Sequence, residues 1–375
     1  MTPEERKLYA GRAAEAHEAM LDRFRKRDGM YKYDQGPSLL RSGAQLWPFG
    51  RALAATLDVA GIDPAMTGNS DAGSDIEDHL RILERYWDPA GPQPAYCSDV
   101  TGASRRGDRY YDDNAWIGLA LVQLERMHPG LGPIERAAQL FEFAAHGWAG
   151  QLGGGVFWVE QGRGTGMRNR DRGTVSNAPN AELGLHLSEL GRLEARARPA
   201  TPEDMYRWVL ATLDRSRSGD RPGTGLFWDK IRADGTIDRA TWSYNQGGMI
   251  GASVLFARLR PDERRVYLER AEAIARMERA LSEYVIHGPT TNIEFHRWIL
   301  RHPRFRAGDF DTRFIQQEFR GLPPQGEGPE RVALAAAAIA ALNGDASRSN
   351  GDTATRPVAA ASRWRAAARR EGLRS

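Results

Sequence analysis

The chain has 375 residues, of which 41% are hydrophobic, so it can bury a sizeable core, while no apolar run reaches the length of a membrane-spanning helix. Its net charge of +3 arises from 52 basic and 49 acidic residues, and the basic surplus falls mainly between Arg348 and Arg374 without a nucleic-acid-binding motif, which argues against a nucleic-acid partner. The single cysteine, Cys97, excludes an intrachain disulfide and a cysteine-rich metal site.

The N-terminal segment is charged and has helical periodicity. Residues 1–27 contain neither an apolar core region nor a cleavage site, so they lack the pattern of a secretory signal. Together with the single cysteine, this segment predicts a cytoplasmic protein.

Apolar periodicity predicts a predominantly helical chain. Helices are expected over residues 3–27, 46–60, 74–87, 113–127, 133–148 and 178–193, from residue 201, after the segment 242–248, and over 262–284, 290–300 and 329–342. Two stretches interrupt this pattern: the glycine-rich segment 150–174, and the segment 219–241, in which a short hairpin is expected.

A coarse repeat runs through the helices. Alternate helices begin about 65 residues apart, near Trp47, Asp113, Asn177 and Tyr244. This spacing is typical of inner and outer helices that alternate around a closed toroid. If the inner helices are parallel, their N-termini gather on one face and the preceding loops build one cleft. We expect residues 1–342 to form this single domain and residues 343–375, which are polar and basic, to form a flexible tail.

Two adjacent carboxylates, Asp112 and Asp113, stand between Tyr111 and Trp116 at the start of an apolar helical pattern. An aspartate in the first turn of a helix accepts bonds from free backbone N–H groups and meets the positive end of the dipole, which accounts for one of them. Sugar hydrolysis accounts for both, because it commonly uses two carboxyl groups that flank the cleaved bond. An acidic helix start with aromatic core packing is the alternative explanation.

These residues resemble glycoside hydrolase family 76, and the resemblance covers about residues 40–300. It is carried by the order and spacing of four motifs: the aspartate pair with its aromatics, the Gly-Gly-Gly-Val-Phe-Trp segment 153–158, Ser176-Asn177, and the Thr-Trp-Ser-Tyr-Asn-Gln-Gly segment 241–247. The family comprises endo-α-1,6-mannanases with an (α/α)6 barrel. The resemblance therefore implies that fold, hydrolysis of α-1,6-linked mannose glycans, and no cofactor or metal.

The resemblance also implies roles for individual residues. Asp112 would be the nucleophile of a retaining mechanism, and Asp113 would be the general acid/base. Retaining enzymes hold these carboxyls about 5–5.5 Å apart, and burial beside a like charge keeps one of them protonated. Residues expected to contact the mannose are Tyr111, Trp116, Trp158, Asn177, Tyr244, Asn245, Gln246 and Arg297. Core packing for Trp116 and helix capping for Asn177 are the alternatives.

Three features depart from the family pattern. Family members are mostly secreted, whereas this chain shows no export signal. The family's late Lys-Gly-aromatic motif is replaced by residues 292–298, in which only Arg297 matches. The arginine-rich insertion at residues 163–172 is expected to be a solvated loop, with recognition of an anionic glycan as its alternative role.

Two other functions are compatible with the same barrel. A sugar epimerase would use a histidine acid–base pair, but no pair with suitable spacing occurs among His79, His186, His287 and His296. A catalytically silent glycan-binding protein is the second alternative, and the presence of both aspartates argues against it. No metal site is expected at the acidic helix face formed by Asp75, Glu77, Asp78 and His79.

Overall fold

The structure is a computed structural model that describes residues 3–32, 43–67, 72–100, 107–214, 226–270, 298–299, 301–306 and 318. All of them belong to Met1–Leu322, the first of two compact units in the chain, and the second unit is Pro323–Ser375. The helix expected at 329–342, most of the one at 290–300 and the domain boundary at residue 342 lie outside the described residues and stay predictions.

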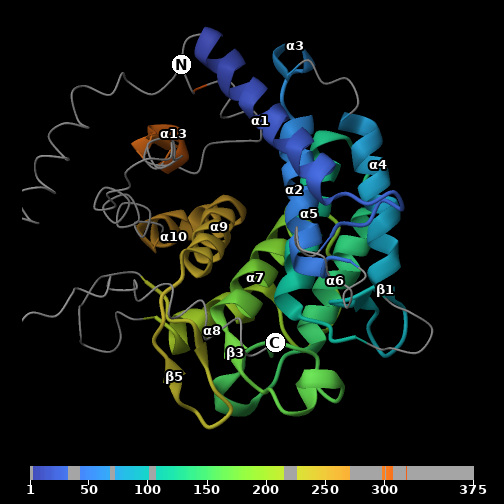
Figure 1. Cartoon of the computed structure of the whole chain (residues 1–375). Coiled ribbons are helices and arrows are strands. Elements are labelled where there is room, and N and C mark those ends of the chain that lie inside the picture. The colour runs from blue at the N-terminus through green and yellow to red at the C-terminus, as the bar shows by residue number, and fades with distance from the viewer. Residues whose placement is uncertain are drawn as a thin grey trace, which may run out of the picture. The chain divides into compact units, whose positions relative to one another are not determined.

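Helices dominate the described chain, with short strands between them (Figure 1). The helices are α1 (Pro3–Phe24), α2 (Leu46–Ala60), α3 (Pro64–Thr67), α4 (Ala72–Leu83), α5 (Tyr111–Met127), α6 (Ile134–His146), α7 (Thr174–Glu189), α8 (Pro202–Thr212), α9 (Ser243–Leu259), α10 (Arg264–Arg270) and α13 (Pro303–Arg306). The strands are β1 (Trp87–Asp88), β2 (Ala95–Tyr96), β3 (Arg172–Gly173), β4 (Lys230–Ile231) and β5 (Ile237–Asp238).

The helices alternate between an inner and an outer position. In the inner series each helix packs against the next, so that α2 contacts α5, α5 contacts α7, and α7 contacts α9. An outer helix follows each inner one and packs on it: α4 on α2, α6 on α5, α8 on α7 and α10 on α9. This alternation is the arrangement of an (α/α)6 barrel, which is the predicted fold class.

The inner helices run parallel and nearly in register. Near the start of this packing, Asn180 on α7 donates to the carbonyl of Tyr111 on α5 at 3.0 Å. Near its end, Arg126 on α5 forms an ion pair with Glu189 on α7. Because neighbours meet in the same order along both helices, their N-termini lie on one face of the domain. The strands β3 and β5 lie in the lower part of Figure 1.

Small residues allow the inner helices to approach one another closely. A Cβ atom at Gly118 on α5 would lie 2.5 Å from Leu183 on α7. A Cβ atom at Gly248 on α9 would lie 3.1 Å from Ala178 on α7. Residues at these crossings are almost fully removed from water, and α7 is buried on most of its surface, as expected for a helix enclosed by neighbours.

The outer helices return antiparallel and present one apolar face. The C-terminal part of α6 lies against the start of α5, where the rings of Phe143 and Tyr111 stack with centroids 4.4 Å apart. The N-terminus of α8 follows the prediction from residue 201: Thr201 accepts from the backbone N–H of Asp204 at 3.1 Å, and Pro202 occupies the first helical position.

Several helices begin or end at residues other than those predicted. Helix α7 begins at Thr174 instead of residue 178, because Gly173 precedes the first turn and the Ser176 hydroxyl accepts from the Gly173 N–H at 3.2 Å. Likewise, α9 begins at Ser243, inside the segment expected to precede it. Helix α4 ends at Leu83, after which a short 3-10 turn leads into β1, and the short helix α3 was not predicted.

The hairpin expected within residues 219–241 is present. Strands β4 and β5 pair antiparallel, and β3 adds to the other edge of β4, which gives a three-stranded sheet in the order β3-β4-β5. The helix expected over 262–284 is described only as far as Arg270. Within the described residues, every helix is too short or too polar to cross a lipid bilayer.

Candidate active site

The two adjacent carboxylates lie in the first turn of α5, at the face where the inner N-termini gather. Asp112 and Asp113 follow Tyr110, whose extended backbone forms the N-cap. Both side chains are partly buried. The Oδ2 atom of Asp112 accepts a hydrogen bond from the indole Nε1–H of Trp158 at 3.2 Å. The site is therefore built where a helix start meets the glycine-rich loop.

Burial raises the pKa of both carboxyls, but different groups face each one. For Asp112 the effect of burial is opposed by the Trp158 hydrogen bond and by first-turn backbone N–H groups, while the charge of Asp229 adds to it, and the pKa rises to about 6. For Asp113 burial and the charge of Asp112 raise the pKa well above its usual value, and the Arg51 guanidinium only partly offsets this. Of the two carboxyls, Asp113 therefore has the one whose neutral form its surroundings favour through burial and the charge of Asp112.

A third carboxylate, Asp229, was not predicted as a site residue. It stands just before β4, where its carbonyl accepts from the N–H of Thr174 at the start of α7 at 2.8 Å. Its Oδ1 accepts from Nδ2 of Asn245 on α9 at 3.2 Å. Burial raises the pKa of Asp229, and its effect is larger than the opposing effects of the Asn245 hydrogen bond and the Lys230 charge. The sequence placed Asp229 only in an expected hairpin, and no local pattern linked it to the aspartate pair.

Amide side chains dock the loops onto the inner helices. The amide stands at the fourth residue of α5, α7 and α9, accepts from the backbone N–H of one loop residue, and donates to the carbonyl of the same residue. The pairs are Asn114 with Tyr96, Asn177 with Val156, and Gln246 with Phe227. Each amide also donates to the carbonyl four residues before it.

This docking accounts for two residues that were predicted to contact substrate. Asn177 is 0% exposed and Gln246 is 3% exposed, and loop backbone atoms occupy both ends of each amide. A hydroxyl of a sugar would have to displace those bonds. We assign Asn177 and Gln246 to loop docking and leave them out of the proposed substrate contacts.

The other predicted contacts fall into a buried group and an exposed group. Tyr111 is 4% exposed and stacked on Phe143, and Asn245 is fully buried beside Asp229. Tyr244 is 46% exposed and stacks nearly parallel to Trp242, with ring centroids 6.2 Å apart and an interplanar angle of 6°.

Trp116 and Trp158 are both partly buried. The Trp116 ring lies under the guanidinium of Arg51 on α2, which is 5.3 Å from its centroid. The Trp158 indole N–H donates a hydrogen bond to Asp112. Arg297 lies outside the described residues, so its predicted role stays a prediction.

Two glycines hold the loop before α7 in place. Gly154 and Gly155 have φ values of +116° and +98°, in the region that favours glycine. A Cβ atom at Gly155 would lie 2.6 Å from the ring of Trp208 on α8. The loop therefore needs glycine both for its backbone conformation and for its close approach to the outer helix.

The arginine-rich insertion is only partly the solvated loop that was expected. Arg163 forms ion pairs with Asp88 at 3.1 Å and with Glu160 at 3.4 Å, and Arg172 is 2% exposed and donates to the carbonyl of Gly154 at 2.9 Å. Arg168 and Arg170 are exposed as predicted. The expectation was wrong for the two inward arginines, because Arg163 binds Asp88, 75 residues away, and Arg172 binds the carbonyl of Gly154, 18 residues away.

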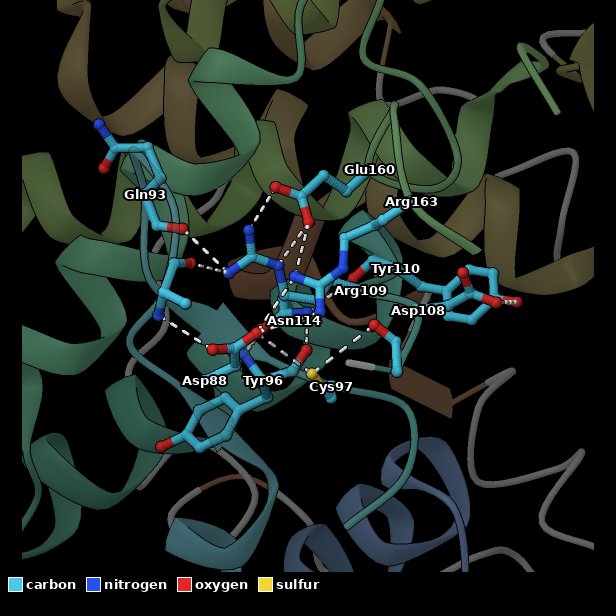
Figure 2. Close-up of polar contacts among 12 residues, drawn as sticks. Asp88, Gln93, Tyr96, Cys97, Asp108, Arg109, Tyr110, Asn114, Glu160 and Arg163 are labelled. Atoms are coloured by element: carbon cyan, nitrogen blue, oxygen red, sulfur yellow. Dashed lines mark hydrogen bonds and ion pairs between the residues drawn. The ribbon is translucent and has the colours of Figure 1, made fainter. Parts of the chain in front are cut away.

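Figure 2 shows the network that ties this insertion to the loop before α5. Arg109, which is 1% exposed, forms an ion pair with Glu160 and donates to the carbonyl of Gln93 at 3.1 Å. Glu160 and Asp88 both bind Arg163, so a single chain of charges crosses from β1 to the insertion. Two loops that border the aspartate pair are thereby held together.

The described residues offer no support for an epimerase with a histidine acid–base pair or for a metal site. Both ring nitrogens of His79 are occupied, by the Asp75 carbonyl at 2.6 Å and by the Tyr31 hydroxyl at 2.8 Å. His186 lies beside Arg126 near the far end of the inner helices, and His287 and His296 are not described. No group of three or more metal-binding side chains comes together in the described part of the chain.

Solved structures with the same fold include glycan-active proteins. An α-mannanase of glycoside hydrolase family 76 from Bacteroides thetaiotaomicron is 19% identical, with 80% of this chain and 81% of that one covered and a TM-score of 0.64. An inactive variant of an α-1,6-mannanase from Salegentibacter sp., bound to α-1,6-mannotriose, is 22% identical over 75% of this chain and 72% of that one, with a TM-score of 0.53. These likenesses confirm the predicted (α/α)6 barrel.

A different likeness covers a short stretch. Biotin carboxylase 1 of Bacillus subtilis is 55% identical over 47 residues, which are 12% of this chain and 10% of that enzyme. The biotin carboxylase of Nostoc sp. is 47% identical over 49 residues, or 13% of this chain and 11% of that enzyme. The chain thus spans about a tenth of the length of these curated relatives.

The family assignment rests on a match over most of the chain. The sequence model described as glycosyl hydrolase family 76 matches residues 9–294, which include the aspartate pair, the glycine-rich loop and the start of α9. The resemblance found in the sequence motifs is therefore confirmed over a longer stretch than the motifs themselves cover. With its helical barrel and with two carboxyls in the first turn of an inner helix, this chain belongs to glycosyl hydrolase family 76.

Proposed function

We propose that this chain is a retaining glycoside hydrolase that cleaves α-1,6-linked mannose glycans, with Asp112 as nucleophile and Asp113 as general acid/base. The observation that carries the proposal is the aspartate pair at the start of α5. Burial and the neighbouring charge raise the pKa of Asp113 well above its usual range, while a hydrogen bond to Asp112 favours its charged form. These surroundings support the proposal, because the mechanism needs one carboxyl that is protonated and one that is ionised.

A relative supports the choice of these residues. The α-1,6-mannanase from Salegentibacter sp. is inactive in a variant with two aspartates at consecutive positions replaced by asparagine. Asp112 and Asp113 are the only adjacent aspartates in this chain. That agreement, together with the family match, favours the aspartate pair as the catalytic residues.

The reaction proceeds in two displacements. Asp112 attacks the anomeric carbon while Asp113 gives its proton to the departing glycosidic oxygen, so the bond from the anomeric carbon to that oxygen breaks as the mannosyl–Asp112 bond forms. Water then attacks the same carbon, Asp113 takes the proton from this water, and the electron pair of the ester bond returns to Asp112. Two inversions leave the product with the configuration of the substrate.

The exposed aromatic residues suggest where the sugar lies. Tyr244 and Trp242 stand at the start of α9 and are 46% and 37% exposed. Trp116 is one turn below the aspartates on α5. We assign the rings of Tyr244 and Trp242 to stacking on mannose, because sugar faces are apolar and aromatic rings offer a flat apolar contact with little entropy loss. The Arg51 guanidinium lies over the Trp116 ring, so the predicted contact of Trp116 stays a prediction. We also assign Asp229, which accepts from Asn245, to accept a hydrogen bond from a sugar hydroxyl.

Incubation with linear α-1,6-mannan and α-1,6-mannooligosaccharides tests the proposal. Shorter oligosaccharides should appear by chromatography, and NMR should show the α-anomer as the first product. A β-1,4-linked mannan serves as the control and should stay intact. Release of the β-anomer first would contradict the retaining mechanism. Absence of cleavage from pH 4 to 8, with binding of the oligosaccharides unchanged in the Asp112→Asn and Asp113→Asn variants, would favour the silent glycan-binding alternative.

The short carboxylase likeness supports no second function. It spans about a tenth of the length of those enzymes, which is too little to carry their catalytic sites as a whole. Interconversion of free sugars without cleavage of polymer would indicate an epimerase, and no paired histidines in the described residues favour that outcome.

A further inference from the structure

Trp158 contacts the proposed nucleophile directly. Its indole Nε1–H donates to Oδ2 of Asp112 at 3.2 Å, and no other side chain among the described residues is hydrogen-bonded to that carboxylate. The other oxygen, Oδ1, is buried and has no hydrogen-bond donor within the described structure. The first-turn N–H groups of Asp112 and Asp113 favour the charged form of Asp112, but neither forms a hydrogen bond of good geometry to Oδ1. The two oxygens of Asp112 are therefore not equivalent.

The backbone fixes the Trp158 indole relative to the helix that carries Asp112. The carbonyl of Trp158 accepts from the N–H of Tyr111, the first residue of α5, at 3.0 Å. The N–H of Trp158 donates to the carbonyl of Asp171 at 2.9 Å. The indole and the nucleophile thus project from two segments that are bonded to each other one residue away from Asp112.

The faces of the Trp158 ring have protein neighbours. The Tyr110 ring lies with its centroid 5.0 Å away at an interplanar angle of 49°. The ammonium of Lys230 on β4 lies 5.9 Å from the Trp158 centroid and forms an ion pair with Asp171 at 3.1 Å. These contacts hold the ring in one orientation and occupy surface that a stacking floor for a sugar would need.

We propose that Trp158 is a positioning residue for the nucleophile, which holds Oδ2 of Asp112 so that Oδ1 is the oxygen that attacks the anomeric carbon. This inference rests on the proposed retaining mechanism and replaces the stacking role that was expected for Trp158. In the first displacement the Oδ1–carbon bond forms, the glycosidic bond breaks, and the proton of Asp113 passes to the leaving oxygen. Oδ2 becomes the carbonyl oxygen of the ester and keeps its hydrogen bond from Trp158.

A hydrogen bond to the charged form of a carboxyl also lowers its pKa. The Trp158 N–H therefore offsets part of the rise in the pKa of Asp112 that burial causes. Loss of the N–H alone should raise the pKa of Asp112 and leave fewer molecules with an ionised nucleophile at a given acidic pH.

The test removes the N–H and keeps the shape of the ring. Site-specific replacement of Trp158 by 3-benzothienylalanine substitutes sulfur for the N–H, and Trp158→Phe provides a genetically encoded companion. We expect the acid limb of kcat/KM to move up by about one pH unit, and kcat to fall about tenfold with little change in KM. The matched control is the same replacement at Trp208, whose buried indole N–H meets no acceptor in the described structure. That variant should keep the wild-type pH profile.

A direct titration makes the result independent of turnover. Carbon-13 NMR of the aspartate carboxyls, with the Asp112 signal assigned by Asp112→Asn, should show a higher pKa for Asp112 in the Trp158 variant than in the wild type. If the wild type cleaves no glycan, the proposed function fails while this titration still reports on the hydrogen bond. An unchanged Asp112 pKa, or a raised KM with an unchanged pH profile, would overturn the positioning role.

The identity of the attacking oxygen is tested by trapping the intermediate. A 2-deoxy-2-fluoro-α-mannosyl donor with an activated leaving group slows the second displacement, and a crystal structure of the trapped enzyme shows which oxygen is esterified. The expected ester is through Oδ1, with Trp158 Nε1 still bonded to Oδ2. An ester through Oδ2, with the indole bond lost, would contradict the proposal.

Discussion

Asn177 and Val156 are bonded to each other through both polar groups of each partner. The Val156 N–H donates to Asn177 Oδ1 at 2.8 Å, and Asn177 Nδ2 donates to the Val156 carbonyl at 3.3 Å. Asn114 and Gln246 repeat this arrangement at the starts of the neighbouring inner helices. The loops that carry Trp158 and Asp229 are thereby docked onto the barrel at defined positions.

Replacement of Asn177 by alanine should lower the free energy of unfolding by about 2–3 kcal/mol, because the buried N–H of Val156 loses its acceptor and no water reaches it. Urea denaturation measures the change. Gln123→Ala is the matched control, since that amide makes one exposed bond to Asp58 at 2.9 Å, and its effect should stay within about 0.5 kcal/mol. Equal effects of the two substitutions would show that the docking bonds add nothing to stability.

Asp112→Asn and Asp113→Asn should each abolish most of the hydrolysis of α-1,6-mannan. For Asp113 the expected loss is about 10²–10⁴-fold, the contribution of general acid–base catalysis, and the loss for the nucleophile should be at least as large. Reducing-end release measures both. Asp108→Asn, at a carboxylate that bonds Thr165 outside the pair, is the comparison variant and should retain most activity.

Azide should distinguish the two aspartate roles. With an aryl α-1,6-mannotrioside, small nucleophiles enter the space left by Asp113→Ala and yield an α-glycosyl azide, because the enzyme ester still forms first. With Asp112→Ala a single displacement should yield the β-azide. The opposite stereochemistry for the two variants would reverse the assignment of nucleophile and acid/base.

Asp229→Asn should shift the acid limb of kcat/KM to lower pH. The charge of Asp229 is one of the effects that raise the pKa of Asp112, so its neutralisation lets Asp112 ionise at a lower pH. The pH at which the acid limb of kcat/KM lies, measured from pH 4 to 8, reports the pKa of Asp112 even when the maximal kcat/KM falls. Asp234→Asn, in the exposed turn of the same hairpin, should leave the limb in place. A limb that moves upward with Asp229→Asn would contradict this electrostatic coupling.

Glu182→Gln should stabilise the protein as the pH rises. Burial raises the pKa of Glu182 from 4.5 to about 8, so between these values the unfolded chain is ionised while the folded one is protonated. The contribution of Glu182 to stability therefore falls with rising pH, by up to about 1.4 kcal/mol per unit, and the neutral glutamine removes this contribution. Urea titrations at pH 5, 6.5 and 8 should show a stability gain that grows with pH.

Glu189→Gln provides the comparison of opposite sign. Burial raises the pKa of Glu189, but the hydrogen bond to His186 and the charges of Arg126 and Arg258 outweigh it and lower the pKa below its usual value. This glutamate contributes stability above its unfolded pKa, so its replacement should destabilise the protein at neutral pH and matter less as the pH falls. A similar dependence of stability on pH for both variants would contradict the opposite pKa shifts of the two carboxyls.

The sequence was sufficient for most of the helices and for the aspartate pair. Helical periodicity and the helix start at residue 201 depend on neighbours within a few residues, and the end of α2 at Ala60 was predicted to the residue. Asp112 and Asp113 could be singled out because two adjacent carboxylates exceed what a helix start requires. The start of α7 was missed because the helix was expected to begin after Ser176 and Asn177, whereas both lie in the first helical turn.

Asp229 and the role of Trp158 depended on contacts between distant segments. Asp229 is 117 residues from Asp112 in the sequence, and its position relative to the pair is set by the three-stranded sheet and by Asn245. Nothing near Trp158 in the sequence distinguishes a ring that stacks on sugar from one that donates to a carboxylate. The same holds for Asn177 and Gln246, whose motifs are compatible with sugar binding until their burial is known.

The sequence by itself determined where most of the described helices lie, that they alternate around a barrel, and which carboxyls are paired, because these properties follow from periodicity and adjacency along the chain. Only the tertiary structure decided which oxygen of Asp112 has a donor, why the pKa of Asp113 is raised, and which amides bind loop backbone. The physical reason is that hydrogen bonding and desolvation act through space, and the fold brings together Trp158 and Asp112, which are 46 residues apart, and Asn180 and Tyr111, which are 69 residues apart.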